Sequence, residues 1–345
     1  MLHAQGRQGG SFHGYPRFVS PRTRVRVIVG AAALAAAGIA VGATVLGRGE
    51  DEGNATPRAN RGAPGLELSV VLRNDPEARA LRRAERAYDR GERRAAREQF
   101  TEVLQQDPES LEAAVGAAVA GWPTATLFRL RELAAEHPQS ALVRLHLGLA
   151  LYANGDDQAA AAEWRRALEV EPDTPSALRA EDLLHAGMAP GRPFFYPSFG
   201  AATSLQGDSA AEQLADLRKA AEKGGLRANL LYGVALQRVG RFVSARAAFE
   251  RARTIDPKSL DAKVAEAVGS FSKGSPADAF SRLGPLAESH PRAPVVRFHL
   301  GLLLLWLRDV EEARRQLQRA ADADRGGFYG KEARALLSRL EAIGT

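Results

Sequence analysis

The 345-residue sequence contains no cysteine. Disulfide bonds, thiolate zinc sites, iron–sulfur ligation and cysteine nucleophiles are therefore excluded together. Aromatic residues make up only 6% of the chain, although 45% of it is hydrophobic. A core of this composition has to be built mainly from alanine, leucine and valine, which favours closely packed helices.

Motifs for catalysis are also missing. The chain has no glycine-rich phosphate loop, no H-E-x-x-H, no G-x-S-x-G and no strand pattern that could position one. Acidic side chains mix with arginine at i, i+3 and i+4, which is typical of a solvated helix surface. We therefore expect no enzyme, no cofactor and no metal site.

The net charge of +6 is distributed unevenly. Residues 1–26 contain five arginines and no acid, residues 48–65 are neutral overall, and residues 66–345 carry only +1. A duplex-binding domain needs a basic face to displace counterions from phosphates. The large part of the chain has no such surplus, so no nucleic acid is expected as a partner.

An uncharged apolar run of 21 residues, 27–47, follows the basic tail. As a helix it reaches roughly the 30 Å of a bilayer core, whereas the apolar region of a signal peptide usually has only about 7–15 residues. We expect a single transmembrane helix, with cleavage near residues 42–44 as the alternative. The preceding arginines place the N-terminus in the cytoplasm and the rest of the chain outside it. Residues 48–65 are typical of a flexible tether.

Proline follows an acidic residue or histidine at positions 108, 138, 172, 257 and 291, that is, at intervals of 30, 34, 85 and 34 residues. The longest interval equals two periods of 34 plus 17 extra residues. A 34-residue period is typical of a solenoid of helix-turn-helix repeats. A small residue, a turn glycine, and an alanine with a large apolar residue recur before each proline, most completely as Gly148, Gly155, Ala160, Trp164, Ala167 and as Gly233, Gly240, Ala245, Phe249, Ala252.

These positions resemble the tetratricopeptide repeat (TPR) family. The resemblance implies an all-α fold: a right-handed TPR-like α-solenoid of about seven helix-turn-helix repeats plus a capping helix, preceded by the single transmembrane helix. Stacked repeats of this kind share one continuous core. The solenoid is expected over residues 66–345, with repeats at 77–108, 109–138, 139–172, 173–223 (insertion 188–207), 224–257, 258–291 and 292–325, and the cap at 328–343.

A duplication is also visible. Residues 143–152 (VRLHLGLALY) match residues 296–305 (VRFHLGLLLL), which indicates that the first three repeats are a copy of the last three. Four histidines occur at two equivalent positions of these copies, and we interpret them as inherited packing residues rather than metal ligands: His137, His146, His290 and His299.

The insertion in the fourth repeat carries a cluster of aromatic residues: Phe194, Phe195, Tyr196 and Phe199. A solvated linker would not carry such a density, so the loop is expected to be ordered and largely buried. It would either fill the groove of its own solenoid, at Leu149, Tyr152, Val234 and Gln237, or contact a partner.

In TPR proteins ligands usually lie along the concave face, which the first helix of each repeat lines. Transferring these positions predicts an apolar groove with an arginine pair near its middle, suited to an amphipathic or extended apolar peptide. Packing between repeats is the alternative role for its apolar members. The candidate groove residues are Leu145, Leu149, Tyr152, Arg227, Val234, Gln237, Arg238, Val268, Phe271, Phe298, Leu302 and Trp306.

The expected function is a membrane-anchored scaffold or adaptor that binds a protein or peptide partner in the cell envelope. Two alternatives stay open. The solenoid could self-associate as a structural homo-oligomer, or the apolar segment could be cleaved and the solenoid secreted.

Overall fold

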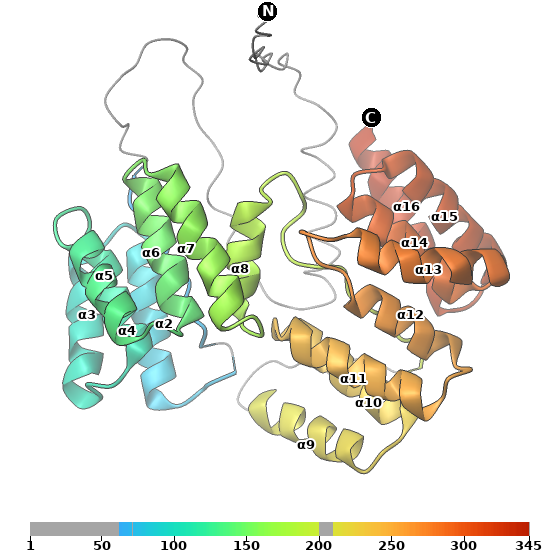
Figure 1. The fold of residues 1–345 in the computed structure, drawn as a ribbon, viewed down its shortest axis with the longest axis horizontal. Coiled ribbons are helices and arrows are strands. Elements are labelled where there is room, and N and C mark those ends of the chain that lie inside the picture. Colours follow the sequence, from blue (N-terminus) through green and yellow to red (C-terminus); the bar gives the residue numbers. More distant parts are fainter. Residues whose placement is uncertain (1–61, 71, 200–209, 345) are drawn as a thin grey trace, which may run out of the picture.

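The computed structural model describes residues 62–70, 72–199 and 210–344, and over these residues the expected all-α solenoid is confirmed, with fifteen helices and no strand (Figure 1). The helices are α2 (Pro76–Asp89), α3 (Arg93–Gln106), α4 (Leu111–Ala120), α5 (Thr126–Glu136), α6 (Ala141–Ala153), α7 (Asp157–Val170), α8 (Pro175–Leu184), α9 (Ala210–Glu222), α10 (Leu226–Arg238), α11 (Phe242–Ile255), α12 (Leu260–Gly269), α13 (Ala277–Ser289), α14 (Pro294–Trp306), α15 (Val310–Ala323) and α16 (Phe328–Gly344).

The transmembrane helix expected at residues 27–47 lies outside the described residues. Among the helices that are described, none combines the length and the hydropathy that a membrane span needs.

In two of the helix hairpins a glycine of the first helix touches an aromatic ring of the second. A Cβ atom built on Gly148 of α6 would lie 2.4 Å from Nε1 of Trp164 on α7. A Cβ atom on Gly233 of α10 would lie 2.3 Å from the ring of Phe249 on α11. These contacts are much shorter than any real Cβ contact, so only glycine allows the two helices of these two hairpins to approach this closely.

The turns inside the hairpins use a left-handed residue. Gly91, Gly155 and Gly240 have φ angles of 79°, 83° and 77°, which favour glycine because it lacks a Cβ atom. The last hairpin keeps the same turn with Arg308 at φ 63°. The turn geometry therefore persists even where the repeat pattern loses its glycine.

Buried apolar side chains form two large cores and a small third group, instead of the single continuous core expected from stacking. We call residues 62–70 with α2–α8 the first lobe, and residues 189–199 with α9–α16 the second lobe (Figure 1). The division falls within the expected fourth repeat, because α8 packs on α6 and α7 whereas α9 packs on α10. The two sequence copies therefore lie in different lobes.

Specific polar contacts join the two lobes at α8. Asp173, just before α8, accepts hydrogen bonds from the backbone N–H groups of Val243 (2.9 Å) and Ser244 (3.0 Å) at the start of α11. Helix α11 has no side-chain cap of its own, so the first lobe supplies one. The buried Lys273, after α12, pairs with Asp182 of α8. The junction is therefore held by a helix cap and a buried ion pair.

We predict that Gly148→Ala destabilises the protein by about 1 to 3 kcal/mol, because the new methyl group overpacks the contact with Trp164. The indole must then move away from the Leu145 carbonyl, to which its Nε1 donates at 3.3 Å. The urea midpoint of the helical circular dichroism signal measures the effect.

The matched control is Gly284→Ala in α13, where an added Cβ meets no atom within 4 Å. Its gain in helix propensity is opposed by the restriction that Pro285 places on the preceding residue, so a change within about 1 kcal/mol is expected. Equal midpoints for Gly148→Ala and wild type would contradict the packing described for α6 and α7.

Candidate functional site

An extended segment, residues 64–70, lies in the core of the first lobe, and we call it the arm. Every second side chain of the arm is buried, namely Pro64, Leu66, Leu68 and Val70, and the residues between them are half-buried. This alternation is the period of an extended strand. The arm therefore presents one apolar edge to the helices, as a bound peptide would.

Polar side chains of α2 and α6 bond to the backbone of the arm, and polar side chains of α8 bond to its side chains. We call these residues the arm site. The N–H of Glu67 donates to Nε2 of His146 at 3.1 Å, and the N–H of Leu68 donates to Glu85 at 2.9 Å. Three further contacts fix the ends and the middle: Tyr88 OH to the Pro64 carbonyl (2.5 Å), Arg82 to the Val70 carbonyl (3.0 Å) and Arg179 to the Glu67 carboxylate (2.7 Å).

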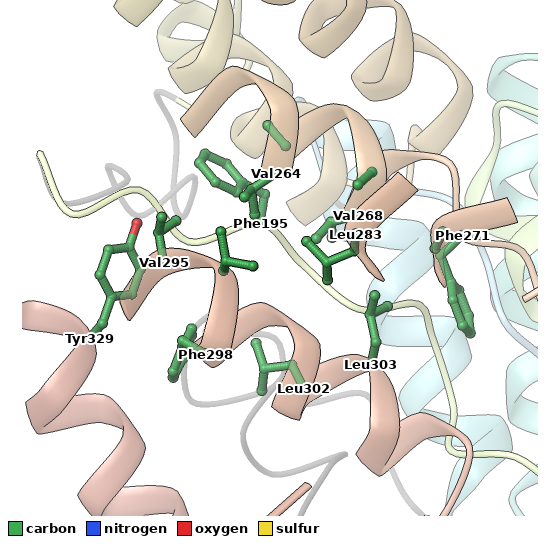
Figure 2. Packing of buried hydrophobic residues seen from close by; sticks show 14 of the residues in the cluster. Phe195, Val264, Val268, Phe271, Leu283, Val295, Phe298, Leu302, Leu303 and Tyr329 are labelled. Atoms are coloured by element: carbon green, nitrogen blue, oxygen red, sulfur yellow. The ribbon is translucent and has the colours of Figure 1, made fainter. Parts of the chain in front are cut away.

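A second extended segment, residues 189–199, lies in the core of the second lobe, and we call it the loop. Pro193, Phe195 and Pro197 are buried at alternate positions. Phe195 is fully buried and lies among Val264, Val268 and Val295 (Figure 2). Its ring centroid is 5.1 Å from that of His299, in a stacked arrangement.

The loop is held in the same manner as the arm. The N–H of Phe195 donates to Gln237 of α10 and the N–H of Tyr196 donates to Nε2 of His299 on α14, both at 3.0 Å. The carbonyl groups are used as well, since Trp306 donates to Gly191 (3.3 Å) and Tyr329 donates to Tyr196 (3.0 Å). We call these four side chains and their surroundings the loop site.

The arm and the loop share one register. Each has a buried proline, then a buried Leu66 or Phe195, and then a residue whose N–H bonds to a histidine. His146 and His299 occupy equivalent positions of the two sequence copies. Two segments of different sequence therefore lie in the same pose, one in each lobe.

Both histidines are neutral and fixed in one tautomer. Nδ1 of His146 lies 2.8 Å from the Leu142 carbonyl, and Nδ1 of His299 lies 2.7 Å from the Val295 carbonyl. Because a carbonyl can only accept, Nδ1 carries the proton, and Nε2 is left to accept the backbone N–H of the segment. Burial lowers the pKa of each histidine to about 4. Interpreting these residues only as packing residues missed this role.

The candidate groove residues do not form one groove. Leu145, Leu149 and Tyr152 belong to the first lobe, and the other nine belong to the second. Most of them are buried, whereas Tyr152 and Arg227 are exposed and Arg238 is half-buried. In the second lobe the loop itself covers two of these residues, since it is hydrogen-bonded to Gln237 and Trp306.

The expected position of the loop is partly correct. It bonds to Gln237, whereas Leu149 packs in the core of the first lobe and Tyr152 lies against Trp164 of that lobe. Only Phe195 among the four aromatic residues is fully buried, because Phe194, Tyr196 and Phe199 lie at the edge of the site and remain half-buried. Phe194 stacks on Phe242 at 5.8 Å, and Arg227 lies 5.0 Å from the ring centroid of Phe199.

A buried ion pair fixes the start of the loop. The sequence did not predict this ion pair. Arg192 donates to both carboxylate oxygens of Glu181 on α8, at 2.7 Å and 3.0 Å. Glu181 is buried and also accepts the N–H of Lys273 at 2.9 Å. No period or motif marks these charges.

Within the described residues no group of three or more histidine, aspartate or glutamate side chains is placed to hold a metal ion.

A sequence model of the tetratricopeptide repeat family matches residues 81–122, 129–180, 203–259 and 266–328, more than half of the chain. Among curated proteins, none matches the chain.

Several solved structures are similar in fold. A tetratricopeptide repeat protein from Parabacteroides merdae is 15% identical, with 77% of this chain and 98% of that chain covered and a TM-score of 0.32. The human IFIT1 dimer with m7Gppp-AAAA is 17% identical (72% and 59% covered, TM-score 0.32), so this chain spans only about three fifths of it. Yeast Tom70 is 13% identical (83% and 67% covered, TM-score 0.30). Similarity at this level says nothing about a shared ligand.

We predict that the contact at His299 makes the stability of the second lobe depend on pH. In the unfolded chain the pKa of histidine is about 6.5, so below that pH the unfolded state binds a proton that the folded state does not. The free energy of unfolding should therefore fall as the pH drops from about 6.5 to about 4, by up to about 3 kcal/mol, and should level off below.

The matched variant is His299→Gln, which keeps an acceptor near Nε2 but cannot titrate. The free energy of unfolding of this variant, relative to that of wild type, should increase as the pH falls from 6.5 to 4. Urea unfolding at several pH values measures the difference. The first lobe is a poorer test, because burial raises the pKa of Glu85 to about 7 and this carboxyl group acts in the opposite direction. Parallel pH profiles for wild type and His299→Gln would contradict the assigned protonation state.

Proposed function

The chain belongs to the tetratricopeptide repeat family, whose repeats typically mediate protein–protein interaction, and from this we propose that it is a membrane-anchored adaptor that binds a protein or peptide partner. One observation carries the proposal. Both lobes already hold an extended peptide segment, with alternate side chains buried and a backbone N–H bonded to a fixed histidine acceptor. Surfaces with this chemistry are suited to recognising a partner's extended peptide.

Backbone contacts and side-chain contacts have the separate roles expected in peptide recognition. Backbone hydrogen bonds to His146, Glu85, His299 and Gln237 supply affinity that depends little on sequence. Pockets for every second side chain supply specificity. A scaffold of this kind needs no catalytic group.

The membrane anchor in this proposal is residues 27–47. It is supported by the length of the uncharged run and by the arginine-rich flank before it. In this arrangement residues 1–26 lie in the cytoplasm, the tether follows outside, and the solenoid stands in the cell envelope.

We predict that a reporter active only outside the cytoplasm is active when it is fused after Thr345. The positive flank before the apolar run and the neutral flank after it give this orientation. Replacing Arg17, Arg22, Arg24 and Arg26 together by glutamate should weaken or reverse the signal. A cytoplasmic readout from the unmodified chain would overturn the proposed location, and a solenoid found in the soluble fraction with a shortened mass would favour secretion.

The adaptor role predicts a stoichiometric partner. The full chain, solubilised in detergent with a tag after Thr345, should recover one protein in constant ratio from its native membranes. The variant Gly148→Leu should lose that protein, because the larger side chain forces the α6 and α7 hairpin apart. Recovery of copies of the chain alone would contradict the adaptor role and favour a self-associating solenoid.

A further inference from the structure

We propose that the arm is an exchangeable internal ligand of the first lobe, and that the arm site receives in its place an extended peptide from a separate partner protein. That peptide has a leading proline, apolar side chains at the second, fourth and sixth positions after it, and an acidic residue at the third. The proposal rests on the adaptor function and specifies where the partner binds and what it looks like.

The first argument is that the pose does not depend on one sequence. The arm reads Pro-Gly-Leu-Glu-Leu-Ser-Val and the equivalent part of the loop reads Pro-Phe-Phe-Tyr-Pro-Ser-Phe. Both place a backbone N–H on the histidine and alternate side chains in the core. The two sites are equivalent surfaces of two different lobes, and each holds a segment of different sequence through an extended backbone and a spacing of apolar side chains. A further segment that meets the same requirements can therefore occupy such a site.

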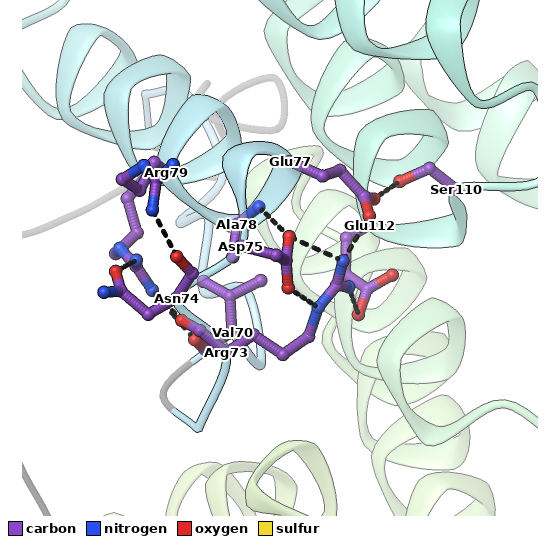
Figure 3. Close-up of polar contacts among 10 residues, drawn as sticks. Val70, Arg73, Asn74, Asp75, Glu77, Ala78, Arg79, Ser110 and Glu112 are labelled. Atoms are coloured by element: carbon purple, nitrogen blue, oxygen red, sulfur yellow. Dashed lines mark hydrogen bonds and ion pairs between the residues drawn. The ribbon is translucent and has the colours of Figure 1, made fainter. Parts of the chain in front are cut away.

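The second argument is that the arm can leave without opening a helix. The turn after it is fastened to α2 by its own contacts: Asp75 accepts the Ala78 N–H at 2.8 Å, Arg82 donates to the Arg73 carbonyl at 2.7 Å and to the Asn74 side chain at 3.0 Å, and Arg79 donates to the Asn74 carbonyl (Figure 3). None of these four contacts involves a residue of the arm. Among the described residues, the turn bonds to the arm only at the Val70 carbonyl, which accepts from Arg82 and from the N–H of Arg73 and which the carbonyl of an exchanging peptide can replace. Helix α2 therefore keeps its first turn when the arm departs.

The loop is not exchangeable in this way. It connects the two lobes, and Phe195 is one of the largest fully buried side chains of the second core. Its first residues are fixed by the Arg192–Glu181 ion pair and by the buried Lys273, which donates to the Ala189 carbonyl at 2.6 Å. Removing the loop would also open the junction at α8. The arm site is therefore the one of the two that can accept a partner.

Charge complementarity defines the acidic position of the ligand. Arg179 on α8 pairs with Glu67 at 2.7 Å, and both side chains are about one third exposed. At the leading proline, the hydrogen bond to the arm site uses the carbonyl of Pro64, which accepts from Tyr88, so a proline loses nothing there by lacking an N–H. The two serines, Ser69 and Ser176, lie with their hydroxyl oxygens 3.2 Å apart, which leaves room for a small side chain at the fifth position.

The same pair of serines provides the test, because the chain has no native cysteine. In the double variant Ser69→Cys with Ser176→Cys, the two sulfur atoms need to approach by only about 1 Å to form a disulfide of normal length. Oxidation then locks the arm on its site, and reduction releases the lock. The variant is made in the full chain in detergent.

The probe is a fluorescent peptide with the sequence of residues 62–72, followed by fluorescence anisotropy. The reduced variant should bind it, and oxidation should weaken binding at least tenfold. Leu66→Asp with Leu68→Asp should strengthen binding of the peptide at least tenfold, because the attached arm competes at a high effective concentration. A peptide with its apolar residues shifted by one position should not bind.

A charge exchange tests the pose. The peptide carrying Glu67→Arg should bind wild type poorly and should regain affinity for the chain carrying Arg179→Glu. A structural role of the arm alone would not produce this rescue.

Four results would overturn the proposal. Equal binding by the oxidised and reduced variant would place the peptide elsewhere. No binding by a Leu66→Asp, Leu68→Asp chain that retains its helical circular dichroism signal would make the arm a permanent part of the core. Disulfide-linked dimers on a non-reducing gel would show that a second copy, not a separate partner, occupies the site. If the oxidised chain still recovers its membrane partner in full, the adaptor function stands and the exchangeable arm does not.

Discussion

The hydrogen bond from a backbone N–H to Nε2 of a buried histidine is the contact on which each lobe depends. In both lobes Nδ1 is committed to a carbonyl of its own helix, so Nε2 is an acceptor in apolar surroundings. An acceptor buried in this way is costly unless a donor reaches it. An extended segment supplies that donor and at the same time covers the apolar surface around the ring. The histidine and the segment therefore stabilise each other, in the first lobe as in the second.

This constraint changes how the solenoid is understood. A uniform stack of repeats would have one core and an open face, but here each set of repeats closes around a segment of its own chain and forms its own core. Helix α8 then acts as the joint, with Asp173 capping α11 and Asp182 pairing with Lys273. Under the proposed function, partner binding would be regulated by release of the segment that occupies the site.

The helix hairpins could be predicted from the sequence, but the positions of the arm and the loop could not. Gly148 with Trp164, and Gly233 with Phe249, recur at fixed local spacing, so periodicity reveals them. The bond between Glu67 and His146 joins residues 79 positions apart, and no period encodes such a pairing. A signal for the arm did exist in the alternation from Pro64 to Val70. The aromatic cluster of the loop predicted a packed segment, yet only Phe195 is fully buried, because burial depends on which side of an extended strand a residue occupies.

Hydrogen exchange followed by mass spectrometry tests the central claim most directly, because it reports on the backbone amides of the two segments in the intact chain. In the fragments that cover residues 64–70 and 193–199, the amides of Glu67, Leu68, Phe195 and Tyr196 should exchange as slowly as those of α6 and α14, although neither segment is helical. The slow amides should include those of Glu67 and Tyr196, the donors to the two histidines. Exchange of these fragments at the rate of an unstructured peptide, with the helices still protected, would contradict the account.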